Sequence, residues 1–358
     1  MQQVDFIIFG QGLAGTGLAH TLDLKGKSYV IIDNCSEETS SFAAAGISHP
    51  ISFKRLLLSW KSNLLIPYAE EFYSKIENLL NTSLYKKHSL FRVFSSIEEQ
   101  NNWLSKMNDE PYKSYLSSSK NELLDSPILH PYDYGKVNSA GRLDVAKYIL
   151  ESRKLFIKKK CLQIEDFDYS LIKQKNTFFN YKNILCSHVV FCEGQQFINN
   201  PFFNYLPSKP SKGELIVIES DEFPALLINK GCFVYPLTNN TFLVGATYNH
   251  EDLSFNCTED GKNELLKKLR NIGDFNFKII QHKAGVRPTT YDRRPIVGCH
   301  PEIKNMHILN GLGSKGVMLS PYFSNELIEN IYVNKAMDSE ANVSRYSKKH
   351  YHKIKLPL

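Results

Sequence analysis

The sequence lacks the marks of a membrane protein, a disulfide-stabilised protein and a metalloprotein. It contains no run of about 18 or more apolar residues, which argues against a transmembrane span. Its 7 cysteines are scattered, without a CxxC pair, and its 11 histidines include no HExxH motif. Scattered cysteines, odd in number, indicate reduced thiols rather than a disulfide or zinc framework. We therefore expect no metal site.

The sequence also begins without a secretory signal. Residues 1–5 include no lysine or arginine, and glycines at turn spacing interrupt the apolar residues that follow. A signal peptide needs a positively charged first region and an unbroken apolar core. Together with the reduced cysteines, this predicts a cytoplasmic protein.

The excess of positive charge is small. Lysine and arginine number 43 against 37 aspartates and glutamates, and the net charge of +6 is far below that of a dedicated nucleic-acid-binding protein. Half of the excess falls in residues 336–358, which we interpret as a basic C-terminal tail. With 42% hydrophobic residues in a chain of 358, the composition predicts a globular protein of two domains.

The strongest pattern present is a glycine motif between two apolar strands. Residues 4–9 form an apolar run, Gly10-Gln11-Gly12-Leu13-Ala14-Gly15 follows, residues 13–24 have helical periodicity, and residues 28–33 form a second apolar run. The glycines permit a tight turn and the close approach of a pyrophosphate, whose charge the helix N-terminus attracts. Strand, loop and helix in register predict a dinucleotide-binding βαβ unit.

The end of the second strand distinguishes between nucleotides. Asp33 ends this strand, where a carboxylate accepts hydrogen bonds from ribose hydroxyls and repels a 2′-phosphate. Asn34, rather than an arginine, follows it. NADP is therefore disfavoured.

A second glycine loop favours FAD over NAD. Residues 310–316 read Asn-Gly-Leu-Gly-Ser-Lys-Gly, between an apolar strand at 306–309 and a helix at 318–332. No apolar strand ending in an acid follows Gly316, so the loop completes no second dinucleotide-binding unit. Its helix N-terminus instead stabilises negative charge, such as that of a reduced flavin, and Lys315 adds to this effect.

The rest of the chain predicts the architecture around these loops. Helical spacing covers residues 66–80 and 144–150, and an apolar run at 185–192 indicates a buried strand. Residues 201–284 are rich in short β segments, typical of an antiparallel sheet: 214–219, 232–235 and 242–246. Residues 100–140 have no organised pattern.

We predict an α/β fold, with a Rossmann-like FAD-binding domain and an α+β second domain built on an antiparallel sheet. The FAD-binding domain is predicted to be discontinuous, comprising residues 1–55, 135–200 and 285–335. The substrate domain comprises residues 56–134 and 201–284, and residues 336–358 form the tail.

Several segments resemble the D-amino acid oxidase-like family of FAD-dependent oxidoreductases, which includes glycine and sarcosine oxidases. Besides the opening motif, the similar segments are 40–47, 190–194, 212–214, 285–289, 292–298 and 311–316. The closing ones, with Gly-Val-Arg-Pro-Thr and Gly-Leu-Gly-Ser-Lys-Gly, are the most specific. The resemblance covers most of the chain.

The resemblance implies a set of cofactor-binding residues from both glycine loops, the small-residue segment and the second FAD-contacting strand. They are Gly10, Gly12, Leu13, Ala14, Gly15, Asp33, Asn34, Ser40, Ser41, Ala44, Ala45, Gly46, Ile47, Cys192, Glu193, Gly194, Gly311, Leu312, Gly313, Ser314, Lys315, Gly316 and Val317. Sarcosine oxidases that attach flavin covalently use a cysteine beside the position of Arg287, where this chain has Gly285 and Val286. We expect non-covalent FAD.

The resemblance also implies the reaction. Its members oxidise the C–N bond beside a carboxylate, and the expected substrate is a small amine or amino acid of the N-substituted glycine type. A hydride passes to flavin N5, water hydrolyses the imine, and dioxygen or another acceptor reoxidises the flavin. The protein then supplies mainly orientation and electrostatics. Arg287 is predicted to hold the substrate carboxylate in a bidentate fork.

The other candidate site residues each have a plainer alternative. Lys315 is placed to contact flavin, substrate or dioxygen, unless it faces solvent. Tyr235 and Tyr248 are predicted to close the pocket, unless they are core aromatics. Glycine oxidase has tyrosine where this chain has Phe233, so a hydrogen bond to the carboxylate is missing and simple glycine is a doubtful substrate. We interpret His49 as a structural histidine.

Two other functions stay open. Residues 245–248 and the loop at 311–316 are similar to the oxidase domain of the bifunctional enzyme that removes a carboxymethyl group from the wobble uridine of tRNA. The chain has no room for that enzyme's methyltransferase domain, so a stand-alone oxidase is expected. A basic rim would then bind tRNA, unless it is a solvated face: Lys54, Arg55, Arg153, Lys154 and Lys158–Lys160. The second alternative, a non-catalytic FAD-fold binding protein, is disfavoured by Arg287.

Overall fold

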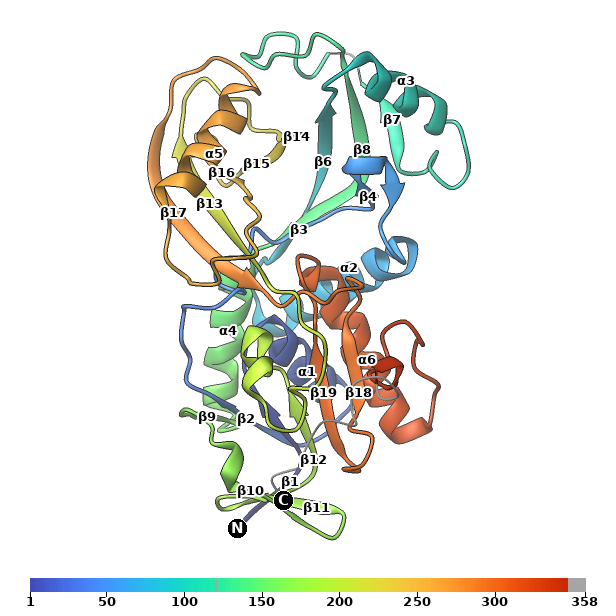
Figure 1. Ribbon diagram of the computed structural model, residues 1–358, viewed down its shortest axis with the longest axis vertical. Coiled ribbons are helices and arrows are strands. Elements are labelled where there is room, and N and C mark those ends of the chain that lie inside the picture. Colours follow the sequence, from blue (N-terminus) through green and yellow to red (C-terminus); the bar gives the residue numbers. More distant parts are fainter. Residues whose placement is uncertain (120, 347–358) are drawn as a thin grey trace.

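The computed structural model describes residues 1–119 and 121–346. Figure 1 shows two sheets that lie one beyond the other along the long axis of the molecule. The N-terminus is at the end of the first sheet that is farther from the second. In the described residues the first sheet has eight strands and the second has nine. The chain passes between them several times, so each domain is discontinuous in sequence.

The first sheet contains the predicted dinucleotide-binding unit. Its order is β10-β11-β12-β1-β2-β9, and β19 and β18 extend it beside β12. Strands β1, β2, β9, β12 and β19 are parallel to one another, and the other three pair antiparallel. Their bounds are β1 (Gln2–Phe9), β2 (Tyr29–Asp33), β9 (Leu162–Ile164), β10 (Ile172–Lys175), β11 (Phe178–Tyr181), β12 (Ile184–Phe191), β18 (Ile296–Cys299) and β19 (Met306–Asn310).

Both faces of this sheet are covered. The side chains of β1 point alternately into two hydrophobic cores, one on each face of the sheet. Phe6 and Ile8 pack toward a helical layer, whereas Ile7 and Phe9 pack toward aromatic residues around η3 (Gly194–Asn199). The helical layer consists of α1 (Leu13–Leu24), α2 (Ser62–Leu80), α4 (Val145–Lys158) and α6 (Gly316–Val333). A strand buried on both faces reads as a continuous apolar run, which is the pattern at residues 4–9.

The second sheet is antiparallel except for one pair. Its order is β17-β13-β16-β15-β14-β6-β8-β3, with β7 beside β8, and β14 runs parallel to β6. The strands are β3 (Ile47–Ser48), β6 (Tyr85–Val93), β7 (Leu116–Ser118), β8 (Tyr134–Leu143), β13 (Ser211–Glu219), β14 (Leu227–Lys230), β15 (Cys232–Pro236), β16 (Thr241–Gly245) and β17 (Lys278–Arg287).

Shorter elements complete this domain. α5 (Glu259–Arg270) packs on one face of the sheet, and α3 (Ile97–Lys106) lies beside β7. The remaining elements are β4 (Ile51–Ser52), η1 (Phe53–Arg55) and β5 (Leu57–Leu58), whereas η2 (Tyr169–Leu171) belongs to the first domain. An α/β domain and a largely antiparallel second sheet agree with the predicted fold class.

The predicted domain boundaries differ from this arrangement at several points, of which two involve whole elements of more than nine residues. Residues 56–134 were predicted to lie in the substrate domain, yet α2 packs on α6 and shares the core of the first domain. Residues 135–200 were predicted to lie in the FAD-binding domain, yet β8 pairs with β6 in the second sheet. Helical periodicity identifies an apolar face but not its partner, and the glycines of β8 hide its strand pattern.

The segment after α6 folds back onto the first domain. Arg345 donates a hydrogen bond of 2.9 Å to Asp292, and Glu340 accepts one of 2.8 Å from the indole of Trp60. A tail was predicted to begin at residue 336. Because of these contacts, residues 336–346 are instead part of the folded domain. Its remaining lysines, Lys348, Lys349, Lys353 and Lys355, lie outside the described residues. In the part of the chain that the structure describes, no helix is long and apolar enough to cross a membrane.

Candidate functional site

One cavity lies where the two sheets meet. Its volume is about 380 Å³, within the range of small-molecule pockets. The first domain contributes both glycine loops and the carboxyl ends of β1, β2 and β12, where ligands of parallel sheets bind. The second domain contributes the ends of β13, β15, β16 and β17. All predicted site residues line this cavity except Gly15, Gly311 and Tyr235.

The first glycine loop has no room for larger side chains. Gly10 has φ +102°, and a Cβ there would lie 2.6 Å from the carbonyl oxygen of Cys192. A Cβ on Gly15 would lie 1.9 Å from the carbonyl oxygen of Gly10, so Gly15 serves close packing and does not line the cavity. Ser41 accepts a hydrogen bond of 3.0 Å from the amide of Leu13. The N-terminus of α1 therefore opens into the cavity beside the small-residue segment.

Asp33 is held in place at the end of β2. Its two carboxylate oxygens accept hydrogen bonds from the amides of Gln11, at 2.7 Å, and Cys35, at 2.6 Å. Asn34 donates to Asp166 at 2.7 Å, and Asp166 also lines the cavity. Asp166 was not among the predicted residues, because it follows a short edge strand without a recognisable motif.

Arg153 supports this loop from α4. Its guanidinium donates to the Gln11 side chain at 2.7 Å and to the Cys35 carbonyl at 3.2 Å. Arg153 was predicted to be part of a basic rim, but these contacts show that it instead stabilises the loop at the nucleotide end of the cavity. Further along α4, Lys154 pairs with Glu151 and Lys159 pairs with Asp23.

Glu193 is a buried acid in the cavity lining. Its carboxyl group accepts hydrogen bonds from the hydroxyl of Tyr169 and, at 2.8 Å, from the amide of Asn200. Burial raises the pKa of Glu193 to about 7, although both hydrogen bonds oppose the shift. The protein can therefore hold this group either neutral or charged near neutral pH.

The second glycine loop places Lys315 at the start of α6. Its ammonium donates a hydrogen bond of 2.6 Å to the buried hydroxyl of Ser59. Burial, with the nearby positive charge of Arg294, lowers the pKa of Lys315 to about 8. Gly311 lies behind the loop, where a Cβ would meet the Ile296 amide at 3.1 Å. Sequence reasoning missed Ser59, which carries no motif and reaches Lys315 only through the fold.

His49 lies beside Lys315 in the cavity lining. Burial and the charge of Lys315 lower the pKa of His49 to about 3, so its imidazole is neutral. Its ring stacks on Phe53 with centroids 5.2 Å apart, and its Nδ1 has no hydrogen-bond partner among the described residues. A structural histidine was predicted, and the structure places this residue in the cavity lining.

Arg287 ends β17 at the other side of the cavity. Its guanidinium donates to the carbonyls of Lys212 and Thr247, each at 3.2 Å, and lies 4.4 Å from the ring centroid of Tyr248. A Cβ on Gly213 would lie 1.9 Å from its Nη2, so glycine makes room for it. Burial lowers the pKa of Arg287, but an arginine stays charged at physiological pH.

The three candidate aromatic residues have different positions. Phe233 lines the cavity, with its ring centroid 5.2 Å from that of His49. Tyr248 also lines it and is 65% exposed, which places its ring at the mouth. Tyr235 does not reach the cavity, because its hydroxyl bonds His88 Nε2 at 2.6 Å and its ring lies under Arg142. The predicted role of Tyr235 in closing the pocket has no support in this arrangement.

These features define a two-domain dinucleotide-binding protein whose second sheet covers one end of the cofactor cavity. The family model described as FAD dependent oxidoreductase, DAO, matches residues 5–329. The chain belongs to this family. It is therefore an FAD-dependent oxidoreductase, as predicted, and its cofactor is FAD.

Relatives differ in how much of their length they share with this chain. Glycine oxidase of Bacillus subtilis is 28% identical over 170 residues, which cover 44% of each protein. The tRNA 5-methylaminomethyl-2-thiouridine biosynthesis bifunctional protein MnmC of Leptospira interrogans is 23% identical over 95% of this chain and 59% of its own. The alignments thus span less than two thirds of both relatives.

Solved structures share the fold. Iminodiacetate oxidase from Chelativorans sp. BNC1 superposes with a TM-score of 0.76 at 18% identity, over 95% of this chain and 98% of the other. At this identity the likeness establishes the fold alone.

The residues present fit FAD. Two helix N-termini, those of α1 and α6, face one cavity, and each stabilises negative charge. Small residues line the passage between them, where a Cβ at Gly10 would strike backbone. Gly10, Gly12 and Asp33 would hold the adenosine and pyrophosphate, and Gly313, Ser314 and Lys315 would lie at the flavin end.

Proposed function

We propose that the protein oxidises the C–N bond beside the carboxylate of a small amine or amino acid of the N-substituted glycine type. The observation that carries this proposal is Arg287. Its guanidinium lies in the cavity lining and is held by two carbonyl oxygens, without a carboxylate partner among the described residues. A charged arginine in such a place calls for an anion from outside the protein.

The geometry of Arg287 leaves hydrogen-bonding capacity for a substrate. A guanidinium has five N–H donors, and the Lys212 and Thr247 carbonyls take two of them. The stacked ring of Tyr248 orients the guanidinium plane from one side. The remaining donors can then bind a carboxylate in a fork, which fixes the α-carbon of the substrate relative to the cofactor.

The surroundings favour a neutral amine beside that carboxylate. Phe233, Leu215 and Leu243 give the cavity an apolar wall, which disfavours a charged ammonium. The neutral imidazole of His49 adds no charge, and Lys315 repels a cation. Bound FAD supplies the acceptor for the two electrons of the C–N bond. The protein supplies the orientation of the substrate and the exclusion of bulk water.

Replacement of Arg287 tests this proposal. The holoenzyme is mixed anaerobically with N-substituted glycines and D-amino acids, and bleaching of the flavin absorbance is followed. We expect Arg287→Met to raise the substrate concentration for half-maximal bleaching by about a hundredfold or more, and Arg287→Lys to recover part of the loss. Arg270→Met on the exposed face of α5 is the matched control. Unchanged bleaching by Arg287→Met would contradict the proposal.

A second candidate function is oxidation of a carboxymethylaminomethyl group on a tRNA nucleoside. The exposed ring of Tyr248 beside Arg287 favours it, because an aromatic ring at a cavity mouth can stack on a base. The similarity to a tRNA biosynthesis protein over nearly the whole chain also supports it.

The two candidates are separable by substrate and by salt. If the nucleoside is the substrate, tRNA that carries the modification bleaches the flavin at lower concentration than any free glycine derivative, and its apparent affinity falls steeply with salt. Tyr248→Ala then weakens tRNA more than small amines. Bleaching by free glycine derivatives alone would remove the second candidate.

A further inference from the structure

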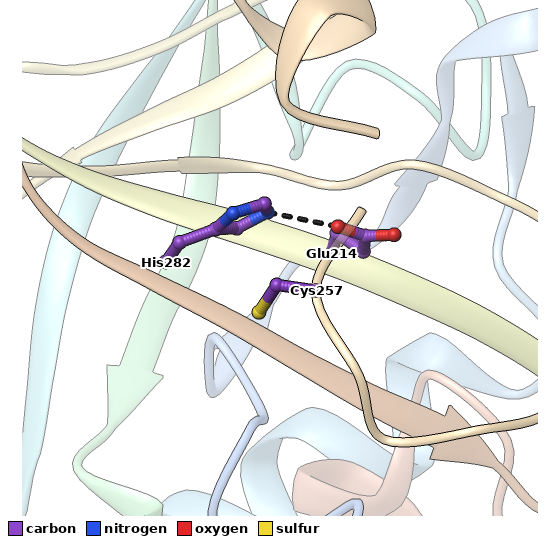
Figure 2. Close-up of side chains that lie close together, drawn as sticks. All are labelled: Glu214, Cys257 and His282. Atoms are coloured by element: carbon purple, nitrogen blue, oxygen red, sulfur yellow. Dashed lines mark ion pairs between the residues drawn. The ribbon is translucent and has the colours of Figure 1, made fainter. Parts of the chain in front are cut away.

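Outside the cavity lining, the fold brings together three side chains that commonly bind zinc. Glu214 on β13, His282 on β17 and Cys257 in the segment before α5 have ligand atoms within 4.8 Å of one another. Figure 2 shows the imidazole of His282 directed at Glu214, with Cys257 beside the pair. Glu214 Oε2 and His282 Nε2 are 2.8 Å apart. The three residues are far apart in sequence, which is why ligand spacing along the chain does not indicate a site.

We propose that Glu214, Cys257 and His282 bind a Zn²⁺ ion, with a water as the fourth ligand. A carboxylate, a thiolate and an imidazole form one of the mixed ligand sets that zinc accepts, and three protein ligands leave one position open. With bonds of about 2.0 Å to oxygen and nitrogen and about 2.3 Å to sulfur, the ligands of a tetrahedral ion lie roughly 3.3–3.6 Å apart.

The ligands need to move only slightly to reach this spacing. The present span of 4.8 Å closes by about 1 Å, while the contact between Glu214 and His282 opens by about half an ångström. Cys257 is exposed and lies in the irregular segment between β16 and α5. Its thiol is therefore the ligand that adjusts, and the two strand residues supply the fixed side of the site.

The charges around the cluster balance when the ion binds. Lys212 is buried, lies 3.7 Å from Glu214 Oε1 and pairs with Asp252. Without metal, the lysine and the two carboxylates carry one net negative charge. A thiol that coordinates a metal is deprotonated and adds a second negative charge, which leaves the cluster neutral once Zn²⁺ is present. Lys212 thus offsets Asp252 and does not cancel the attraction for the ion.

Neighbouring groups already orient the carboxylate. Glu214 accepts hydrogen bonds from the amide of Thr258, at 2.9 Å, and from its hydroxyl, at 2.7 Å. Gly261 leaves space for it, because a Cβ there would lie 2.5 Å from the Glu214 carboxyl carbon. Hydrogen bonds of this kind fix a metal ligand before the ion arrives. The bound ion would link β13, β17 and the start of α5.

Zinc binding to the holoenzyme tests the proposal. The protein is stripped with a chelator, dialysed to equilibrium against buffered Zn²⁺, and its zinc content is counted by mass spectrometry. We expect one zinc per chain at micromolar free Zn²⁺. Cys257→Ser and His282→Asn should each weaken binding about tenfold or more, whereas Cys35→Ser and His250→Asn should bind as the unaltered protein does. Cys257 is exposed, so its variant should fold.

Co²⁺ gives a second measurement that does not depend on activity. Tetrahedral Co²⁺ bound through a thiolate absorbs at wavelengths beyond the flavin bands, and Cys257→Ser should abolish that signal. A chain that takes up no zinc would overturn the site, and so would a Cys257→Ser variant that binds zinc as tightly as the unaltered protein. In either case the 2.8 Å contact between Glu214 and His282 links β13 and β17 without a metal.

Discussion

Lys315 donates its hydrogen bond to Ser59 across the boundary between the second glycine loop and the segment that enters α2. The contact fixes an ammonium group in the cavity lining. Because burial and Arg294 lower the pKa of Lys315 to about 8, this group changes charge at a pH where the enzyme can be assayed. The other cavity cation, Arg287, does not.

Lys315 should make anion binding depend on pH. Below about pH 8 its ammonium is charged and attracts a carboxylate, and the charge is lost as pH rises through that value. We expect the affinity of the oxidised holoenzyme for acetate to fall several-fold across this range, as measured from the flavin absorbance. Lys315→Met should bind acetate weakly at all these pH values, and Lys209→Met on the surface should behave as the unaltered protein does. A fall that persists in Lys315→Met would show that another group titrates.

Gly213→Ala should displace Arg287 and leave the fold intact. The added Cβ would lie 1.9 Å from Nη2 of Arg287, so the guanidinium must move. We expect the KM for a carboxylate substrate to rise about tenfold or more with the flavin content unchanged. The double variant Gly213→Ala/Arg287→Lys should lose less than the sum of its parts, since both changes disturb one contact. Additive losses would place the effect of Gly213→Ala elsewhere.

Gly10→Ala should prevent FAD binding. The new Cβ would lie 2.6 Å from the carbonyl oxygen of Cys192, and φ of +102° is strained for any residue with a Cβ. Purified protein should be colourless, and added FAD should not restore flavin absorbance. Circular dichroism should report unchanged secondary structure. A yellow protein of full flavin content would contradict this assignment of the loop.

Glu193 should make stability fall as pH rises. Burial raises the pKa of its carboxyl group to about 7, above the ordinary 4.5, so the folded state favours the neutral acid. Its contribution is fully present below about pH 4.5 and is lost as pH rises through 7. Glu193→Gln should gain stability relative to the unaltered protein over that range, by up to about 3 kcal/mol. Thermal unfolding at several pH values measures this, with Glu264→Gln on α5 as control; an equal difference at all pH values would count against it.

The βαβ unit was predictable because the local structure at each of its positions restricts the residue type found there. The helix expected at residues 13–24 is α1, and the strand expected at 28–33 is β2, shorter by one residue. A covered parallel strand has to be apolar throughout, and its following loop has to be glycine, so both leave a direct trace in the sequence.

The region around α3 and β8 was not predictable for the opposite reason. α3 buries a single side chain, Trp103, and β8 contains Gly135 and Gly141, which pack against Trp103 and Tyr85. Neither element has the periodic apolar stripe on which sequence reasoning depends. Their structure is determined by contacts with residues that are distant in sequence.

The site residues that belong to a sequence motif were predictable. Those brought to the cavity only by the fold were not. Phe233 and Tyr235 share one face of β15, but two residues along a strand advance the chain by about 7 Å, and only Phe233 reaches the cavity. Ser59 approaches the cofactor cavity from the segment before α2, and Asp166 and Tyr169 approach it from the segment between β9 and β10. No pattern in the sequence joins them.

Strand β13 has a different chemical environment on each of its two faces, and adjacent residues of the strand face the two sides. Gly213 faces Arg287 and the cofactor cavity. The next residue, Glu214, points to the other side of the sheet, where it contacts His282 and Thr258. A displacement of this strand on one side is therefore felt on the other. If an ion binds at Glu214 and a substrate carboxylate binds at Arg287, a single peptide bond then connects the two sites, and substrate binding would depend on residues that do not line the cavity.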